Sequence, residues 1–542
     1  MESSKIYLKE IEKQLYGCTN KYNINENFVF HISKHPNFDV QCNNFVKFKN
    51  LEKTLKNLIE QEITENSFIE VCEFGNNNFL NIKFSEEYIQ NCLKKNQNFS
   101  FEEVKTVLLD YGGFNIGKAL HVGHIRSLNI GRSLYNTLKF VGYKPISDIH
   151  YGDWGVQMAQ IVAYIIKNEI DLKTIKLSDL DAIYPKASLL SREDNIFSSL
   201  VSNVLQNLNK KNDIEYKIWK EIYNLSTREI ENILSTLGYR FDQKFGESDV
   251  IDIIPDLLAK FDALGLTEID DGALIASDKQ EPPAILVKSD GTYVYLTTDI
   301  GTVVNREANY KNDLYIYITD QRQSLHFKQL FKLVDYLSLS NSEFKHVGFG
   351  TVNDGQGKPL KTRDGGVYKL VDLFTEVEKK LESKNTDKKI AKNLAKSILT
   401  YSDLVTKRVS DYNFDLEKFT NINGKSAIYL QYAQVRAKKL LDSKVVERNF
   451  YNFNEDERTL ALEIINFSYA LEQTVKTLEP HHIAEYGYSL AQKFNIFYKN
   501  NKILTDELDL ETSTTRLSLV EAFHETILNV FYCLGLDPVD TM

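Results

Sequence analysis

The chain carries few of the features expected outside the reducing interior of a cell. Its 542 residues include only five cysteines, which form no CxxC pair and no zinc-ligand spacing: Cys18, Cys42, Cys72, Cys92 and Cys533. Its opening residues hold early charges and no apolar core of the signal-peptide kind. No apolar run approaches the roughly 20 residues that cross a bilayer. Because scattered thiols suit a reducing compartment, we expect a soluble, cytoplasmic protein with no membrane partner.

An excess of basic residues is also missing. The 75 acidic side chains outnumber the 65 lysines and arginines, which gives a formal net charge of -10. This balance excludes a protein whose whole surface is basic, but nucleic acid stays open because local patches make phosphate contacts. The length exceeds what one hydrophobic core serves, and it predicts about three or four domains.

Glycine is scarce at both ends of the chain and concentrated in the middle. Of the 25 glycines, 20 lie between residues 101 and 370, two lie before this region and three lie after it. Glycine marks tight turns and close backbone approaches. The middle therefore predicts an α/β domain rich in strands and loops, and the end predicts helices.

Strand-like and helix-like segments alternate in the middle. Continuous apolar runs predict four buried strands, at 104–110, 144–150, 314–320 and 344–350. Alternation of this kind is typical of a parallel, doubly wound sheet. We therefore predict a Rossmann-like domain over 102–370, with a helical insertion at about 186–237.

The two ends of the chain predict separate domains. Residues 1–101 indicate a small α+β module, with two strands around the polar loop Asn76–Asn78. Over 371–542, apolar residues recur every three or four positions, which predicts an α-helical bundle of about five or six helices. Pro480 suits the first turn of one of them. The predicted fold class is α/β and multidomain.

The stretch FNIGKALHVGH contains two histidines, His121 and His124, where the first predicted strand gives way to a helix. On a helix, this spacing places both rings on one face. A zinc site would need a third ligand, which the stretch does not offer, and a lone histidine is most often structural. Nucleotides bind at strand carboxyl ends, and helix N-termini attract phosphate. We therefore expect both imidazoles and Lys118 to contact phosphoryl groups, with Gly123 admitting the adenosine.

A second basic segment follows the fourth predicted strand. GKPLKTRDGG, residues 357–366, places Lys358, Lys361, Thr362 and Arg363 between glycines. Alone, this segment would be a solvated basic loop. Together with the two histidines it fits a mobile clamp on the triphosphate of ATP, which stabilises charge on the leaving pyrophosphate without acid–base chemistry.

These two segments resemble the HIGH and KMSKS signatures of class I aminoacyl-tRNA synthetases. Within that class, NIGKALHVGH, GDWG, YLTTD, QSLHFKQ, the basic segment and LEPHHIAEY occur in the order typical of arginyl-tRNA synthetases. FGNNNFLNIKFS resembles the N-terminal tRNA-binding module of that family, and the helical end resembles its anticodon-binding domain. The resemblance implies L-arginine, tRNA(Arg) and ATP with Mg²⁺ as partners, and a monomer.

The resemblance also assigns catalytic residues. It implies this role for Lys118, His121, His124, Lys361 and Arg363, with Gly123, Lys358 and Thr362 as further ATP contacts. The basic segment aligns as PLKTR, without the first lysine of KMSKS. The resemblance implies a variant of the family in which a lysine beside HIGH helps to compensate, and Lys118 fits that place.

The residue chemistry independently suits an arginine substrate. A guanidinium group fits paired carboxylates that accept its N–H groups as a fork, and Tyr295 and Asp299 lie four apart on one predicted helical face. The resemblance makes Asp299 and Glu247 the guanidinium ligands, with the Tyr295 hydroxyl alongside. Three polar residues would hold the α-amino and carboxylate end, although each could be a surface or sheet-edge residue: Asn115, Gln323 and Asp110.

The helical end offers a candidate RNA contact. Tyr432 and Arg436 lie one turn apart, where a ring can stack on an unpaired base and a cation can hold a phosphate. A core tyrosine and a solvated basic face are the alternatives. The resemblance adds Met542 at the anticodon pocket, although the acidic–arginine pair that usually precedes this methionine is missing.

Three other functions stay open. A small nucleotidylyltransferase also uses HxGH but would not need the long helical end. A paralogue that binds tRNA without charging it is disfavoured by the intact His121, His124, Lys361 and Asp299. The cysteine enzyme of class I would require a zinc-ligand cluster. We therefore predict an arginine–tRNA ligase, which forms arginyl-adenylate from ATP and transfers arginine to the 3′-terminal adenosine of tRNA(Arg) for protein synthesis.

Overall fold

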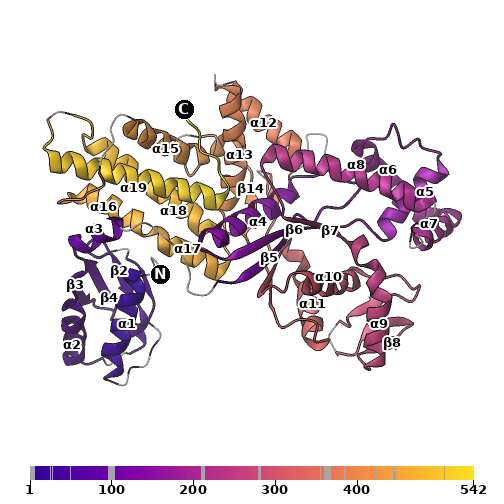
Figure 1. The fold of residues 1–542 in the computed structure, drawn as a ribbon, viewed down its shortest axis with the longest axis horizontal. Helices are drawn as coiled ribbons and strands as arrows, with labels where there is room; N and C mark the ends of the chain where they lie inside the picture. Colours follow the sequence, from indigo (N-terminus) through magenta and orange to yellow (C-terminus); the bar gives the residue numbers. More distant parts are fainter. Residues whose placement is uncertain are drawn as a thin grey trace. The chain divides into compact units, whose positions relative to one another are not determined.

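The computed structural model forms two compact units (Figure 1). The first comprises Met1–Glu103, Phe140–Gly142 and Lys418–Met542, and the second comprises Val104–Lys139 and Tyr143–Glu417. The structure is described for residues 6–22, 24, 26, 28–33, 35–48, 51–94, 104–208, 211, 214–278, 282–354, 356–358, 360, 368–383, 386–421, 424–442, 447–505 and 507–542.

A five-stranded parallel sheet forms the centre of the second unit. Its strands, in spatial order, are β12 (Glu343–His346), β11 (Leu314–Ile318), β5 (Thr106–Tyr111), β6 (Lys144–Tyr151) and β7 (Gln243–Gly246). The chain adds β6 and β7 on one side of β5, and later adds β11 and β12 on the other. Ligands bind doubly wound sheets where the order reverses in this way. The predicted α/β class is confirmed, and all four predicted strands form.

Helices cover both faces of this sheet. They include α4 (Gly123–Phe140), α10 (Tyr295–Asn309) and α11 (Ser324–Tyr336). α10 and α11 share an apolar core with Leu108 and Tyr317 on one face (Figure 1). On the other face, an added Cβ at Gly131 of α4 would lie 2.3 Å from the Tyr111 ring. Because side chains alternate along a strand, α4 and α10 sit on opposite sides of β5.

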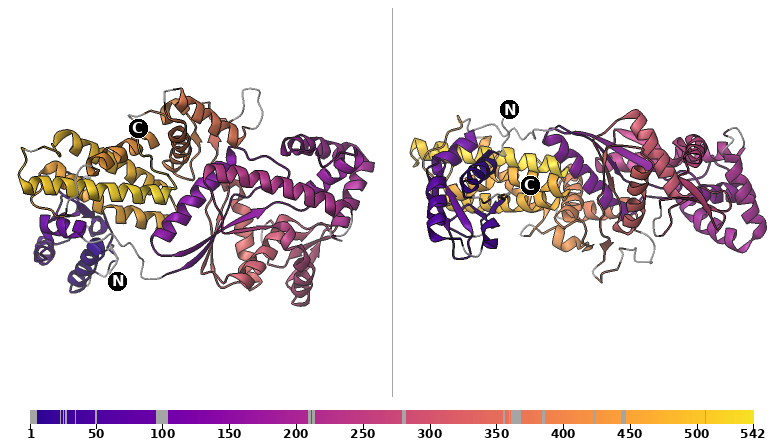
Figure 2. Two further views of the ribbon diagram at one scale, coloured as in Figure 1. Left: turned by 45° about the horizontal axis from the view of Figure 1, so that its top comes forward. Right: turned by 90° about the horizontal axis from the view of Figure 1, so that it is seen from below.

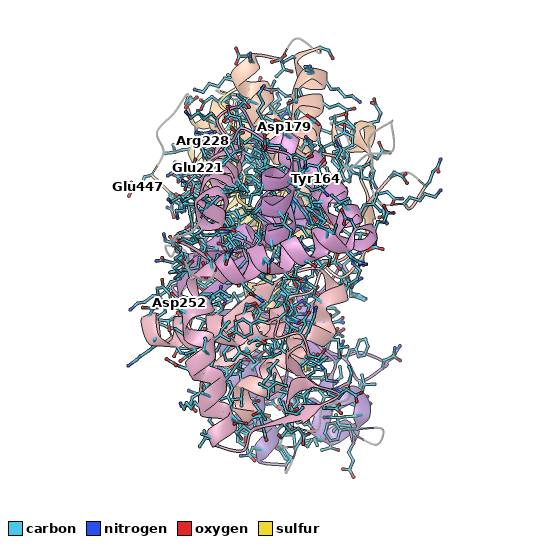
Figure 3. All side chains as sticks on the ribbon, turned by 90° about the vertical axis from the view of Figure 1, so that its right-hand side faces the viewer. Tyr164, Asp179, Glu221, Arg228, Asp252 and Glu447 are labelled. Carbon is cyan, nitrogen blue, oxygen red and sulfur yellow. The ribbon has the colours of Figure 1, made fainter. Side chains whose placement is uncertain are left out.

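Four helices separate β6 from β7, namely α5 (Val156–Lys167), α6 (Leu177–Glu193), α7 (Asn195–Leu208) and α8 (Ile214–Leu237). Figure 3 faces this group, with Tyr164 on α5, Asp179 on α6, and Glu221 and Arg228 on α8. The helical segment predicted at about 186–237 therefore begins inside α6. Its start was misplaced because Pro185, which breaks most helices, lies within α6.

The remainder of the second unit includes elements that the sequence did not predict. After β7 come η2 (Glu247–Asp249), η3 (Ile251–Ile253), α9 (Ile254–Ala263) and a small antiparallel sheet of β8 (Thr267–Asp270), β9 (Ala273–Ala276) and β10 (Ile285–Val287). Asp252 of η3 is labelled in Figure 3. These strands are only three or four residues long, so alternation along them is too brief to recognise.

The second unit continues past the predicted boundary at 370. It includes α12 (Leu370–Glu382), α13 (Lys388–Leu404) and a pair of two-residue strands, β13 (Val352–Asn353) and β14 (Tyr412–Asn413). The expectation that only helices follow residue 370 is wrong for β14. Arg126 of α4 donates from Nε to Asp403 of α13 at 2.8 Å, and both side chains are buried. This ion pair joins α13 to α4, one of the helices that cover the parallel sheet.

The first unit contains an antiparallel sheet and a group of helices (Figure 2). The sheet order is β1 (Phe30–Ile32), β2 (Val40–Cys42), β4 (Leu80–Phe84) and β3 (Ile69–Phe74), with α1 (Ile6–Asn20), α2 (Lys53–Thr64) and α3 (Glu86–Lys94). The helices that follow the 4-residue α14 (Leu416–Phe419) are α15 (Ala427–Leu441), α16 (Glu455–Ile465), α17 (Phe467–Thr477), α18 (His481–Asn500) and α19 (Leu510–Leu534). Pro480 directly precedes α18 at its N-cap position, one residue before the first turn in which the sequence predicted it. Among the residues described, no helix is long and apolar enough to span a membrane.

Candidate active site at the carboxyl ends of the strands

The two histidines of HVGH lie on different kinds of backbone. His124 belongs to the first turn of α4, whereas His121 precedes the helix in a backbone bridge to Lys369. They therefore do not share a helical face as the spacing predicted. Their rings stack instead, with centroids 3.9 Å apart and planes 30° apart.

Backbone N–H groups determine which ring nitrogen of each histidine carries hydrogen. The Gly123 amide donates to Nδ1 of His121 at 3.0 Å, and the His121 amide donates to Nδ1 of His124 at 3.1 Å. A nitrogen that accepts such a bond has no hydrogen of its own, so each neutral ring carries its hydrogen on Nε2. Burial lowers the pKa of His124 to about 3, helped by His121 and Lys118, and it also lowers the pKa of His121. Both rings are therefore neutral near pH 7, and each offers one Nε2–H donor.

Gly123 is the residue that permits this stacked arrangement. A Cβ added at Gly123 would lie 2.8 Å from Cε1 of His121. The imidazole could not keep its place beside any larger residue. The close approach of the His121 ring therefore explains why glycine occupies position 123. The role of Gly123 in admitting adenosine stays a prediction.

Lys118 places a positive charge near the two histidines. Its ammonium group donates to Oε1 of Gln157 at 3.3 Å and lies 4.2 Å from the ring centroid of Tyr184. Partial burial lowers the pKa of Lys118, while Asp181 acts in the opposite direction. Lysine normally titrates so far above neutrality that Lys118 stays cationic at pH 7.

Most of the predicted clamp cannot be placed. Lys361, Thr362 and Arg363 lie outside the described residues. Lys358 is exposed, and its backbone N–H donates to Oδ1 of Asp354 at 3.0 Å. The roles of these four residues stay predictions.

A pocket of about 560 Å³ opens beside the predicted guanidinium ligands. Its walls include Trp154, Gln157, Glu247, Tyr295 and Thr298. The amide of Trp154 donates to Glu247 at 3.3 Å, and the Gln157 amide group lies 3.5 Å from the Tyr295 hydroxyl. A pocket of this size accommodates a small metabolite.

The acidic side chains at the pocket favour a positively charged ligand. Glu247 is only 7% exposed, and burial, aided by Asp153 and Asp299, raises the pKa of its carboxyl to about 8. A free carboxyl with this pKa is mostly protonated at pH 7. A positive ligand beside Glu247 would favour the carboxylate, and a guanidinium group would also fill its hydrogen-bonding capacity.

Asp299 lies on α10, four residues beyond Tyr295, as the sequence predicted. Its Oδ2 lies 2.5 Å from Nε2 of His326 on α11. The tyrosine begins α10 and is 59% exposed as a residue, while burial of its hydroxyl, aided by Glu247, raises its pKa. Among the predicted arginine ligands, Glu247 and Tyr295 line one pocket, and Asp299 acts on Glu247 electrostatically.

Asp110 makes a contact that the sequence did not reveal. Its Oδ2 accepts from Arg306 of α10 at 2.7 Å, and the same guanidinium donates to Asp148 of β6 at 2.6 and 3.0 Å. Arg306 and both acids are buried. Arg306 could have been noticed because it lies seven residues after Asp299, on the same helical face. The proposed contact between Asp110 and substrate stays a prediction.

Asn115 and Gln323 lie at two other strand ends. Asn115 pairs with Gly152 beyond β6, where an added Cβ would lie 2.3 Å from Oδ1 of Asn115. Gln323 ends the 3-10 turn η4 (Gln321–Gln323) that precedes α11, and it is exposed. Among the residues that the structure describes, neither side chain forms a hydrogen bond with another predicted ligand, so their substrate roles stay predictions.

The helical end places a cation between two rings. The guanidinium carbon of Arg436 lies 4.2 Å from the Tyr432 ring centroid and 5.0 Å from that of Tyr498, and the guanidinium donates to the Tyr432 hydroxyl at 2.8 Å and to Asn495 at 3.1 Å. Tyr498 and Asn495 belong to α18 and were missed by sequence reasoning. Met542 is 42% exposed. The arrangement offers aromatic faces next to a fixed charge.

Comparisons with known proteins cover both parts of the chain. Residues 88–416 match the family described as tRNA synthetases class I (R), catalytic domain, and residues 430–542 match the DALR anticodon binding domain. The arginine–tRNA ligase of Agathobacter rectalis is 30% identical, over 94% of this chain and 95% of that protein. The arginine–tRNA ligase of Francisella tularensis subsp. holarctica is 32% identical, over 86% and 88%. The solved arginyl-tRNA synthetase of Plasmodium falciparum has the same fold, with a TM-score of 0.84, 24% identity and full coverage of both chains.

Proposed function

Because this chain belongs to the arginyl-tRNA synthetase family of the class I tRNA synthetases, we propose that it acts as an arginine–tRNA ligase. The observation that supports this activity most directly is Glu247 in the 560 Å³ pocket, where burial, aided by the neighbouring acids Asp153 and Asp299, raises its pKa to about 8. A guanidinium group relieves that repulsion. It also matches two carboxylates better than an ammonium group does.

We assign the amino acid to this pocket. Glu247 and Asp299 bind the guanidinium group, with the Tyr295 hydroxyl beside it. Neutral citrulline would leave these acids without a counter-charge, which is the basis of strong rejection. Polar groups at the strand ends then bind the α-amino and carboxylate end, namely Asn115, Gln323 and Asp110.

In the first step, a carboxylate oxygen of arginine attacks the α-phosphorus of ATP. A new P–O bond forms, the bond to the β-phosphate breaks, and pyrophosphate leaves with its negative charge. The Nε2–H donors of His121 and His124 and the cation of Lys118 stabilise the charge that builds on the phosphoryl oxygens. We propose that Lys358, Lys361, Thr362 and Arg363 act as the clamp on the departing phosphates.

Mg²⁺ enters with ATP in this proposal. It prefers oxygen ligands and usually binds through substrate phosphates and few protein groups. In the described part of the chain, three metal-ligand side chains come together only at Glu479, His481 and His482 of the helical end. This distribution supports a metal held mainly by the phosphates.

In the second step, the 2′-hydroxyl oxygen of the terminal adenosine attacks the carbonyl carbon of arginyl-adenylate. A new C–O ester bond forms, the bond between the carbonyl carbon and the phosphate oxygen breaks, AMP leaves, and the proton of the 2′-hydroxyl passes to the leaving phosphate or to water. We propose that the helical end binds the anticodon through Tyr432, Arg436 and Met542, and that the N-terminal α+β module, predicted over 1–101, provides another tRNA contact.

We further propose a cytoplasmic monomer. All five cysteines are free thiols, and burial raises the pKa of Cys42 to about 11 and that of Cys18 to about 12. Such thiols are unreactive and serve packing. They support a reducing compartment. The monomer rests on the family resemblance and is tested by sedimentation at several protein concentrations.

Exchange of radiolabelled pyrophosphate into ATP tests the activity. We expect exchange that depends on arginine, measured with and without tRNA(Arg). No exchange under either condition would refute the enzyme proposal, and exchange driven by another amino acid would refute the pocket assignment. Asp299→Ala should weaken arginine binding and leave tRNA(Arg) binding intact. Loss of both would show that Asp299 is structural.

A further inference from the structure

His326 contacts the side chain that is assigned to the guanidinium group. Its Nε2 lies 2.5 Å from Oδ2 of Asp299, and the two side chains are 30% and 24% exposed. Asp299 belongs to α10, whereas His326 belongs to the first turn of α11. The two helices lie side by side on the sheet (Figure 1).

The ring of His326 is held from behind by an aromatic layer. It lies edge-to-face on Phe327, with centroids 5.2 Å apart. Phe327 stacks on His346 at 4.7 Å, and Nε2 of His346 lies 2.9 Å from the Thr319 hydroxyl at the end of β11. Packing of this kind restricts the side chain to one rotamer. The position of His326 is therefore fixed relative to the parallel sheet.

A fixed imidazole orients the carboxylate that it contacts. Bidentate recognition of a guanidinium group requires the carboxylate plane to be aligned with the guanidinium plane. The bond to Oδ2 restrains rotation of the Asp299 carboxylate, while its other oxygen and remaining lone pairs serve the ligand. Groups bonded to a ligating side chain commonly control its orientation in this way.

The contact between His326 and Asp299 also connects the protein groups that are assigned to the two ends of the substrate. Gln323, which is proposed to hold the α-amino and carboxylate end, lies three residues before His326. Asp299 would hold the guanidinium end. The contact between α10 and α11 therefore sets the distance between groups that bind opposite ends of one amino acid.

We propose that His326 is a positioning residue for arginine, which aligns Asp299 and couples it to Gln323; this rests on the substrate assignment given above. His326 does not touch the reacting atoms. Its loss affects arginine and leaves the ATP contacts at His121 and His124 in place.

Two substitutions separate a positioning role from a merely structural one. His326→Leu removes the donor while keeping apolar bulk on Phe327. His326→Gln retains an amide N–H at a similar reach. We expect His326→Leu to raise the KM for arginine by between about tenfold and about a hundredfold, with the KM for ATP unchanged. His326→Gln should stay within about threefold of the parent chain.

The control is Lys328→Ala, which changes an exposed residue of the same helix and removes a nearby charge. It should leave both KM values unchanged. Pyrophosphate exchange over a matrix of arginine and ATP concentrations measures all four proteins, and thermal unfolding checks their folding. His326→Ala repeats the test if the leucine variant melts early.

Each outcome bears on a specific claim. An active His326→Leu enzyme with an unchanged KM for arginine would overturn the positioning role while the proposed activity stands. Equal losses in His326→Leu and His326→Gln, or a parallel rise in the KM for ATP, would also overturn it. Absence of arginine-dependent exchange in the parent chain, both with and without tRNA(Arg), would overturn the proposed function, and the inference with it.

Discussion

The stacked rings of His121 and His124, with centroids 3.9 Å apart, each accept a backbone N–H at Nδ1. Both neutral rings are thereby limited to one donor, the Nε2–H. Two histidines of a metal site would present free ring lone pairs, whereas these rings present hydrogen-bond donors. Hydrogen-bond donors of this kind can bind the oxygens of a phosphoryl group.

His124→Asn should slow pyrophosphate exchange more than His124→Gln. The glutamine amide reaches about as far as Nε2, whereas the asparagine amide reaches only about as far as Nδ1. Loss of one donor to developing charge costs about 10²- to 10³-fold in rate. The measurement is kcat for exchange at saturating arginine and ATP. Equal rates in the two variants would show that Nε2–H is not the group that matters.

Arginine affinity should rise with pH because of Glu247. The free carboxyl has a pKa raised to about 8 by burial and by Asp153 and Asp299, so it holds a proton at pH 7. Binding of a guanidinium group favours the carboxylate and releases that proton. Below about pH 8, affinity should therefore increase with pH by up to about tenfold per unit, and it should level off above pH 8.

Calorimetry in buffers of different ionisation enthalpy measures this proton release directly. At pH 7 we expect nearly one proton to be released for each arginine bound. Glu247→Gln provides the matched control, because it keeps the shape of the side chain but cannot ionise. It should bind arginine more weakly and lose this pH dependence. An unchanged proton release in Glu247→Gln would assign the effect to another group.

Gly123→Ala should impair catalysis without lowering stability. Alanine favours helix over glycine by up to about 1 kcal/mol, and Gly123 begins α4. Its Cβ would, however, lie 2.8 Å from the imidazole of His121. We expect slower exchange with an unchanged or higher midpoint of urea unfolding.

Gly17→Ala is the matched control for that change. Gly17 also lies in a helix, α1, but an added Cβ meets no atom within 4 Å. It should gain similar stability and keep full exchange activity. A Gly123→Ala variant as active as Gly17→Ala would show that the His121 ring can move without cost.

Sequence patterns predicted the central sheet well because their signals are local. Long apolar runs such as 104–110 and 314–320 specify buried strands, and the spacing of Tyr295 and Asp299 specifies one face of a helix. The start of α4 was less predictable. His121 lies just outside the helix because its backbone bridges to Lys369, almost 250 residues away in the chain.

Long-range partners account for the features that the sequence did not reveal. Arg306 joins Asp110 to Asp148, and His326 meets Asp299 across two helices. Each of these contacts depends on which strand lies beside which, and a single sequence does not specify that order. Glu247 could be proposed from resemblance, but its raised pKa follows only from its burial beside other acids.

The last prediction concerns Arg436, whose guanidinium group lies close to the rings of Tyr432 and Tyr498 at the helical end. Tyr432→Ala removes a base-stacking face and one partner of Arg436, so it should weaken tRNA(Arg) binding by about 1–3 kcal/mol. Tyr432→Phe keeps the ring and loses only the hydroxyl that accepts from Arg436 at 2.8 Å. It should cost about 1 kcal/mol or less. Fluorescence anisotropy with labelled tRNA(Arg) measures both affinities.

Arginine binding to the RNA-free protein is the internal reference for these tyrosine variants, and it should not change. Tyr336→Ala is the matched control, because it removes a partly exposed tyrosine at the end of α11 rather than in the helical end. It should bind tRNA(Arg) normally. If Tyr432→Ala binds as tightly as Tyr336→Ala, Tyr432 serves packing against Arg436 and another surface of the helical end must contact the RNA.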